Sequence, residues 1–289
     1  LTMRGVPAIA LTGNNKDLDK DLNACASFHS FLFCVGFVGP EMALSKNFHA
    51  NVLKSEVFQD SCIALVVDEA HNISEWGTDD FCPDFAHIHQ ENALFGCLPS
   101  NLPTPVAPAT VPLEIIEDMK DKLSMRKDTI IIAVSNEKLN VSLSVHVMQH
   151  PQDRFTDLLP LFPSKALGPL DFPQTLIYVN GHQEAERVQD FLQSDSLECI
   201  LGNHFEFYHR YVTEDHKMFI ERGLYDGSLR AVPPTDALGM VHYLLYICIK
   251  RVVLWNKPHT FNSLIQKIGQ CVQVFTEVSK AILFMTKQQ

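Results

Sequence analysis

The feature that most constrains the fold is a short apolar run that ends in charged residues. Residues 63–67 are apolar and rich in β-branched side chains, which is typical of a buried strand in a parallel sheet. They are followed directly by Asp-Glu-Ala-His at residues 68–71. Because burying an unpaired charge is costly, these side chains are expected to face a crevice. Ligands of open α/β sheets bind outside the carboxyl ends of the strands, so the stretch predicts an α/β fold with a polar site there.

The two adjacent acids suit metal-assisted hydrolysis. Asp68 can hold Mg²⁺, often through water, and Glu69 can activate a nucleophilic water. An ordinary strand followed by an exposed acidic turn is the alternative interpretation.

The residues that follow favour the hydrolytic interpretation. After the DEAH sequence, residues 73–77 read ISEWG and residues 80–81 read DF. DEAH with an aromatic-rich loop at this spacing resembles the RecQ-type DNA helicases of superfamily 2, which are nucleic-acid-stimulated ATPases built from two RecA-like domains. The resemblance implies ATP and Mg²⁺ as cofactors and DNA, single-stranded or partly duplex, as a partner.

The same resemblance implies a role for each of five residues. Asp68 would position Mg²⁺, Glu69 would act as the general base and His71 would link the two domains. Trp76 and Phe81 would sense DNA by stacking on its bases, which tolerates any base sequence.

A second match lies in the C-terminal half. Residues 235–240 read TDALGM, which resembles the family's strand-end turn that contacts nucleic acid and senses the nucleotide. Thr235 would contact nucleic acid, and Asp236 and Gly239 would lie at the nucleotide. An Asp that caps an ordinary helix is the alternative. Residues 261–271 resemble the helix of the last helicase motif, and the resemblance implies that Gln266 lies at the nucleotide as well.

Parts of the nucleotide site depart from the family pattern. The 289 residues contain no GxxxxGK[ST] loop, whose amides and Lys hold the nucleotide phosphates. The three arginine positions of the last motif read Lys267, Gln270 and Gln273, and Pro108 replaces the Ser of a Ser-Ala-Thr strand end. We therefore expect a truncated, degenerate 3′–5′ DNA helicase that is impaired or inactive as this chain. The alternative is a non-enzymatic DNA-binding or interaction module, or a relic without function.

The expected architecture is two RecA-like domains with mainly parallel sheets. The first domain, residues 1–158, is expected to be incomplete because the phosphate loop is missing, and the second spans residues 159–289. A proline-rich stretch that begins at Pro151 marks the connection. The main strands are expected at residues 31–38, 63–67, 129–134 and 140–150 of the first domain, and at residues 175–179, 229–232, 252–255 and 281–285 of the second.

Composition limits the partners. A chain that is 46% hydrophobic and 20% charged is expected to build sizeable cores. Its formal net charge of −11 predicts weak DNA binding, because such affinity comes largely from Lys and Arg at phosphates.

Zinc and membranes are not expected partners. The eight cysteines form no CxxC pair, and Cys82, His87, His89 and Cys97 lack a standard zinc spacing. No signal peptide and no apolar run long enough to span a bilayer occurs, so the nucleus or the cytoplasm is the expected location.

Overall fold

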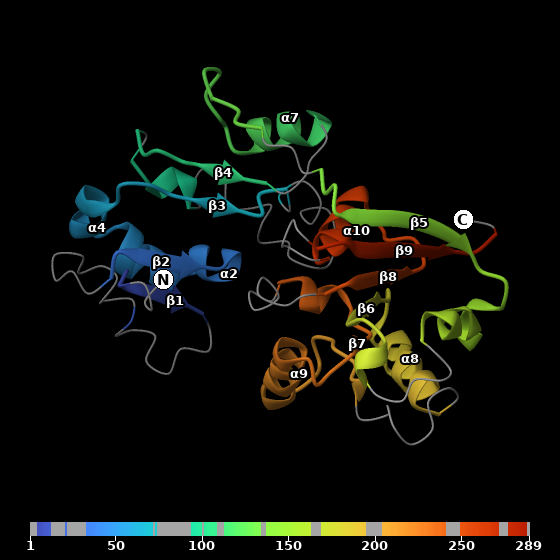
Figure 1. The fold of residues 1–289 in the computed structure, drawn as a ribbon. Helices are drawn as coiled ribbons and strands as arrows, with labels where there is room; N and C mark the ends of the chain where they lie inside the picture. Colours follow the sequence, from blue (N-terminus) through green and yellow to red (C-terminus); the bar gives the residue numbers. More distant parts are fainter. Residues whose placement is uncertain are drawn as a thin grey trace. The chain divides into compact units, whose positions relative to one another are not determined.

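The computed structural model describes residues 5–12, 21, 33–71, 73, 94–99, 101–108, 113–133, 137–162, 169–194, 204–240, 249–271 and 277–287. The chain divides into two compact units, Leu1–Ala133 and Val134–Gln289, which we call the N-terminal unit and the C-terminal unit (Figure 1). No helix within the described ranges has the length and apolar character that crossing a bilayer would require.

The N-terminal unit contains two short parallel strand pairs. Strand β1 (Ala8–Leu11) pairs with β2 (Val35–Val38), and β3 (Val67–Asp68) pairs with β4 (Val106–Ala107). Between and after them lie α2 (Pro40–Ala43), α3 (Lys46–Phe48), the π-helix η3 (His49–Leu53), α4 (Glu56–Ser61), the 3₁₀ turn η4 (Phe95–Cys97) and α7 (Leu113–Lys122). One small core packs around Leu11, Phe48 and Leu53, and another packs around Val67, Ile73 and Met119.

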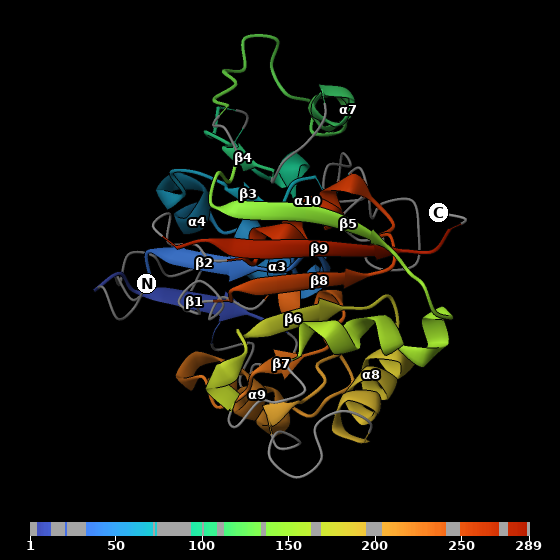
Figure 2. The ribbon, with the colours of Figure 1, turned by 45° about the vertical axis from the view of Figure 1, so that its right-hand side comes forward.

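The C-terminal unit is built on a five-stranded, all-parallel sheet. Its strands are β5 (Val141–Val147), β9 (Ser279–Met285), β8 (Arg251–Trp255), β6 (Thr175–Tyr178) and β7 (Ala231–Val232), in that spatial order (Figure 2). The central strands β6 and β8 are buried along almost their whole length, as expected for parallel strands that are covered on both faces.

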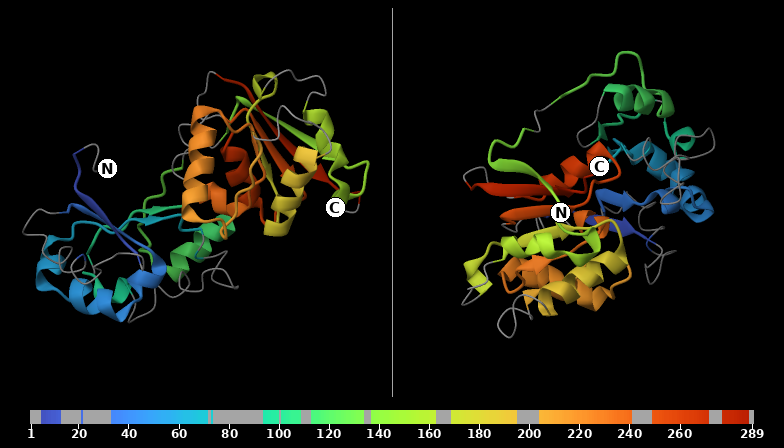
Figure 3. Two further views of the ribbon diagram at one scale, coloured as in Figure 1. Left: turned by 90° about the horizontal axis from the view of Figure 1, so that it is seen from below. Right: turned by 90° about the vertical axis from the view of Figure 1, so that its right-hand side faces the viewer.

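Helices cover both faces of this sheet. On one face lies α8 (His182–Ser194), and on the other lie α9 (Glu214–Asp226) and α10 (Phe261–Gly269) (Figure 3, left). Short 3₁₀ turns fill the connections: η5 (Gln152–Arg154), η6 (Thr156–Leu161), η7 (Pro169–Asp171) and η9 (Asp236–Met240).

Local sequence explains how α8 packs, where α9 ends and where α10 begins. In α8, Ala185, Val188 and Leu192 recur at helical spacing and are buried, so one face packs on the sheet. Helix α9 ends at Gly227, whose φ of 79° is the left-handed conformation common after a helix. Helix α10 begins after Thr260, whose side chain accepts a hydrogen bond from the Ser263 N–H.

The α/β class and the parallel sheets are confirmed, but several expected details differ. Only Val67–Asp68 of the expected strand at 63–67 enters a ladder, and Ile63 and Val66 are exposed. No strand forms over the described residues 129–133, where Ile130, Ile131 and Ile132 are exposed. Both runs are apolar enough for a strand, but in the described part of the structure neither obtains a full ladder partner.

The division between the units also differs from the expected boundary at residue 158. The strand assigned to the first domain, β5, pairs with β9 along its whole length, and the C-terminal unit begins at Val134. An alternating apolar–polar strand fits either domain on sequence alone, and its hydrogen-bonding partner decides the assignment.

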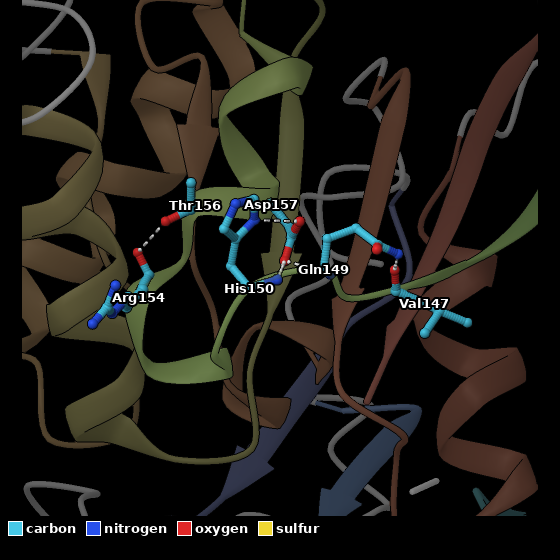
Figure 4. A network of polar contacts seen from close by, with 6 residues as sticks. All are labelled: Val147, Gln149, His150, Arg154, Thr156 and Asp157. Atoms are coloured by element: carbon cyan, nitrogen blue, oxygen red, sulfur yellow. Dashed lines mark hydrogen bonds and ion pairs between the residues drawn. The ribbon is translucent and has the colours of Figure 1, made fainter. Parts of the chain in front are cut away.

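Asp157 fixes the chain where it leaves the sheet after β5. Its carboxylate accepts hydrogen bonds from the backbone N–H groups of Gln149 (3.1 Å) and His150 (3.0 Å), and His150 Nδ1 lies 3.0 Å from its other oxygen (Figure 4). Burial alone would raise the pKa of Asp157, but the hydrogen bonds from His150 and Gln149 outweigh it and lower the pKa. The charged carboxylate therefore stabilises the fold.

Replacing Asp157 by Asn is expected to lower the free energy of unfolding at pH 7 by about 1–3 kcal/mol, as is typical for hydrogen bonds to a charged group. Because the pKa is lowered in the folded state, this contribution is present above the ordinary Asp pKa of about 3.9 and is lost as the pH falls through the lowered value. Urea unfolding of wild type and Asp157→Asn, measured from pH 7 downward, checks both points.

The exposed neighbour Asp153 provides the control. Asp153→Asn should leave the free energy of unfolding within about 0.5 kcal/mol of wild type. Equal losses of unfolding free energy in the two variants would contradict a stabilising role for the Asp157 carboxylate. A loss in Asp157→Asn that grows toward acid pH would contradict it too.

Candidate active site

The DEAH sequence sits at the carboxyl end of β3, as expected. Val67 N–H donates to Pro105 O (3.0 Å) and Ala70 N–H donates to Ala107 O (3.4 Å), which holds the stretch against β4. The side chains of Val67 and Ala70 are buried in the core beneath it. The two acids between them, Asp68 and Glu69, are exposed. The buried residues therefore anchor the acids at the end of the strand.

A tight backbone turn separates the two acids. Glu69 has φ = 48°, in the left-handed region that residues other than Gly rarely occupy. Asp68 Oδ1 accepts a hydrogen bond of 2.9 Å from the Glu69 N–H, which helps to hold this turn. Left-handed residues of this kind cost about 1–3 kcal/mol and cluster at functional sites. The observation is consistent with a functional position for Glu69.

Glu69 is paired with the histidine of the same motif. His71 Nδ1 lies 3.4 Å from Glu69 Oε2, and the His71 side chain is buried while that of Glu69 is half-exposed. Partial burial, and then the negative charge of Asp68, raises the pKa of Glu69. A carboxylate with a raised pKa accepts a proton from water more readily. Glu69, paired with His71, thus has the chemistry of a general base, and Asp68 is a second acid beside it.

The same residues can be tested for a fit to Mg²⁺. No cluster of three or more His, Cys, Asp or Glu side chains forms a closed metal site within the described ranges. Mg²⁺ in nucleotide enzymes is commonly held by one or two carboxylates, with waters and phosphates completing the octahedron. The exposed Asp68 carboxylate fits this open type of site. It does not provide a dedicated metal cage.

The TDALGM sequence lies at the carboxyl edge of the sheet in the C-terminal unit. It follows β7, and Thr235 N–H donates to Tyr208 O (3.0 Å). Residues from Asp236 onward form the 3₁₀ turn η9, which includes the backbone of Gly239, and Leu238 is buried beneath it. This is a strand-end turn, as the resemblance implied, and it places Thr235 and Asp236 at the edge where α/β sheets bind ligands.

An ion pair joins this turn to α10. Lys267 Nζ lies 2.8 Å from Asp236 Oδ1, and the lysine side chain is only 7% exposed against 68% for the aspartate. The ammonium also lies 5.5 Å from the ring centre of Tyr178, within cation–π range. By the resemblance, Lys267 stands at an arginine position of the last motif, and here its ammonium is paired within the C-terminal unit. Gln266 lies within α10 and Gln270 directly follows the last residue of this helix, and both are half-buried.

A buried histidine at the same edge was not assigned a role from the sequence. His209 Nε2 lies 3.0 Å from Glu186 Oε1, and Nδ1 accepts a hydrogen bond from the Tyr211 N–H (3.3 Å). The ring stacks on Phe207 and meets that of His182 edge-on. Glu186 and His182 are distant from His209 in the sequence, so no local spacing could have indicated these two contacts.

Several predicted residues lie outside the described ranges. These are Trp76 and Phe81 of the aromatic loop, Gln273 of the last motif, and Cys82, His87 and His89 of the weighed zinc grouping. That Asp68 and Glu69 meet Thr235, Asp236 and Gln266 in one cleft, and that His71 links the two units, stay predictions.

The Lys267–Asp236 pair yields a test of its structural role. Asp236→Asn leaves the buried ammonium without a counter-charge, and we expect the free energy of unfolding to fall by about 1–3 kcal/mol. Glu214→Gln is the matched control, because it breaks the pair between Lys217 and the exposed Glu214 at 2.7 Å. Such a surface pair contributes at most about 1 kcal/mol. Equal effects in urea unfolding would show that the Lys267 pair is no more than a surface contact.

Comparison with known proteins gives sequence relatives at low identity. No family model matches the chain. It is 24% identical over 279 residues to the ATP-dependent helicase wrn-1 of Caenorhabditis elegans, covering 93% of this chain and 24% of that protein. It is 28% identical over 207 residues to mouse WRN, a bifunctional 3′-5′ exonuclease/ATP-dependent helicase (71% and 14%). It is 25% identical over 231 residues to Bacillus subtilis RecQ (79% and 34%).

Comparison with solved structures supports the fold. The DUF1998 helicase MrfA bound to DNA superimposes with a TM-score of 0.69 at 14% identity, covering 97% of this chain and 38% of that one. Yeast Dbp5 bound to RNA and ADP BeF₃ gives 0.66 at 16% identity (98% and 65%). The chain spans between about a seventh and a third of the three sequence relatives named above. Its sequence is similar to those of ATP-dependent DNA helicases of the RecQ type, and it has a RecA-like α/β fold.

Proposed function

We propose that this chain is a RecQ-like helicase core that binds nucleotide and DNA but hydrolyses little or no ATP. The observation that carries the proposal is the arrangement at the end of β3. Glu69 is held near the buried His71 and beside the exposed Asp68, which suits a general base next to a carboxylate that could hold a metal. The names of the sequence relatives, which are ATP-dependent helicases, support the same assignment.

Each residue at this edge has a proposed part in handling a nucleotide. Mg²⁺–ATP, when bound, supplies the transferable phosphoryl group and the positive charge that neutralises its oxygens. Asp68 would hold the metal, directly or through water. Glu69 would accept a proton from water, and His71 would keep the Glu69 carboxylate in place. In the C-terminal unit, Asp236, Gly239 and Gln266 would lie at the nucleotide.

Residues of the last motif argue that hydrolysis is impaired. An arginine finger can contribute about 10³ to 10⁵ in rate, and Lys267 lacks the planar fork that binds phosphate bidentately. The Lys267 ammonium is moreover paired with Asp236, and Gln270 is neutral. Phosphoryl-transfer chemistry would therefore proceed without its usual cationic partners.

DNA is the proposed macromolecular partner. Thr235, which is half-buried after the carboxyl end of β7, is proposed to contact DNA, and Trp76 and Phe81 are proposed to stack on bases of single-stranded or partly duplex DNA. The net charge of −11 favours weak, salt-sensitive binding. We propose the nucleus or the cytoplasm as the location, because the dispersed cysteines suit a reducing compartment.

A non-enzymatic module is the second candidate. It is favoured by the burial of Lys267 in its ion pair, which serves stability rather than a phosphate. This candidate predicts DNA binding that nucleotide does not alter, whereas the main proposal predicts that Mg²⁺–nucleotide changes it.

ATP turnover in the presence of single-stranded DNA tests the loss of hydrolysis. We expect wild type and Glu69→Gln to give the same low rate, because Glu69 lacks the groups that would complete the reaction. Glu114→Gln, at an exposed acid of α7, is the control for changes in net charge. A DNA-stimulated rate that falls by about 10²-fold or more in Glu69→Gln alone would instead show a working general base and an active helicase core.

A further inference from the structure

A thiol and an imidazole meet in the N-terminal unit, at the core that includes Leu11 and not at the core beneath the DEAH sequence. Cys97 Sγ lies 3.8 Å from His49 Nδ1. His49 is the first residue of η3 and Cys97 is the last residue of η4, and both are half-buried. The two residues are 48 positions apart, so only the fold brings them together.

The second ring nitrogen of His49 decides where the proton of this contact lies. His49 Nε2 lies 2.8 Å from Ala43 O. A backbone carbonyl can only accept a hydrogen bond, so Nε2 carries the hydrogen. In a neutral imidazole the other nitrogen is then an acceptor. The contact at Nδ1 is therefore a hydrogen bond that the Cys97 thiol donates.

The backbone holds the thiol and the ring in this position. The side-chain amide of Gln59 donates to Cys97 O (2.6 Å) and to Leu53 O (2.5 Å), so it ties the last residue of η4 to the last residue of η3. The helix that carries His49 is a π-helix, a rare form that occurs frequently at functional sites. The distance between sulfur and nitrogen is thus set by the fold of the unit.

This arrangement is the one that activates nucleophilic side chains. It consists of a nucleophile, a base within hydrogen-bonding reach, and a third group that orients the base. Cys97, His49 and the carbonyl of Ala43 fill these three positions. The site is therefore a thiol with an oriented base, which differs from an isolated cysteine.

Two other thiols of the chain show the contrast. Cys62 Sγ donates to Ala64 O (3.6 Å) and Cys271 Sγ donates to Lys280 O (3.5 Å). A backbone carbonyl cannot take up the thiol proton, and burial raises the pKa of both thiols. Raising the pKa lowers the fraction of the reactive thiolate, so these two cysteines are expected to be slow nucleophiles.

We propose that Cys97 is a site of reversible modification by small-molecule disulfides, with His49 as its base. The Cys97 sulfur attacks one sulfur of the disulfide while its proton passes to His49 Nδ1. A new bond forms between the two sulfurs and the original disulfide bond breaks. The departing thiolate takes the proton back from Nδ1. The products are a mixed disulfide at Cys97 and one free thiol, so no further oxidant is needed.

A disulfide suits this site because both halves of the reaction use the same ring nitrogen. The attacking thiol loses a proton and the leaving thiolate gains one, so His49 returns to its starting tautomer with Nε2–H on Ala43 O. The described cysteines, at positions 34, 62, 97 and 271, are free thiols. The proposal is independent of nucleotide and DNA binding.

Reaction of the full chain with oxidised glutathione tests the site. Alkylation stops the reaction, and peptide mass spectrometry then gives the rate of mixed-disulfide formation at each cysteine. We expect Cys97 to react at least about tenfold faster than Cys62, because a positioned base typically contributes about 10²-fold or more. Cys62 is the matched control, since it lies in the same unit and is also half-buried.

His49→Gln removes the base and keeps a donor for Ala43 O. The rate at Cys97 should fall at least about tenfold, and the rate at Cys62 should stay unchanged. If the variant unfolds, the rate at the half-buried Cys62 rises, and wild type in concentrated urea then decides. There the advantage of Cys97 over Cys62 should disappear.

Four results would overturn the proposal. They are equal rates at Cys97 and Cys62 in the native wild type, a rate at Cys97 that His49→Gln leaves unchanged in the folded variant, an advantage of Cys97 that persists in urea, and a product in which Cys97 is joined to another cysteine of the chain.

Discussion

Parallel strand pairing is the constraint on which the rest of this structure depends. In the C-terminal unit β9, β8, β6 and β7 all run in the same direction, so their carboxyl ends meet at one edge. The short pair of β3 and β4 does the same on a smaller scale. Polar residues that follow the strands of one sheet thus lie at the same edge, although they are far apart in the sequence. The DEAH and TDALGM sequences both occupy such positions.

Charged residues at these two edges are used in different ways. Glu69 keeps an exposed carboxylate, a raised pKa and a buried histidine partner, which are properties of a group available for proton transfer. Lys267 is buried against Asp236 and the ring of Tyr178, which is a property of a group that joins two elements. A chain can keep the Glu69–His71 pair and still lose catalysis when its lysine is held in an ion pair, as Lys267 is with Asp236. This contrast is the physical basis for proposing a helicase core with impaired hydrolysis.

Strands that are buried on both faces could be predicted from sequence. The apolar runs of β6 and β8 lie at the core of the C-terminal unit, as predicted. Residues 129–134 are equally apolar, yet the described part of this run forms no strand, because an apolar run specifies a strand only when it obtains a ladder partner. For a related reason the compact C-terminal unit includes β5, which is assigned by its pairing with β9 and not by its own pattern.

Side-chain pairs between distant segments could not be predicted from the sequence alone. The positions of Asp236 and Lys267 were identified as motif residues, but nothing in their spacing indicates an ion pair of 2.8 Å. The contact between His209 and Glu186 likewise depends on where α8 packs against the sheet. In contrast, the exposure of Asp68 and Glu69 followed from elementary energetics, because unpaired charges at the end of a strand avoid burial.

The most direct measurement is calorimetric titration of the full chain with a non-hydrolysable ATP analogue, with and without Mg²⁺. It asks whether the acids at the end of β3 form a metal–nucleotide site, as the proposed function requires. The account predicts weak binding that requires Mg²⁺ and becomes at least about tenfold weaker in Asp68→Asn, a difference of about 1.4 kcal/mol. Binding that is equally strong without Mg²⁺ and unchanged in Asp68→Asn would contradict it.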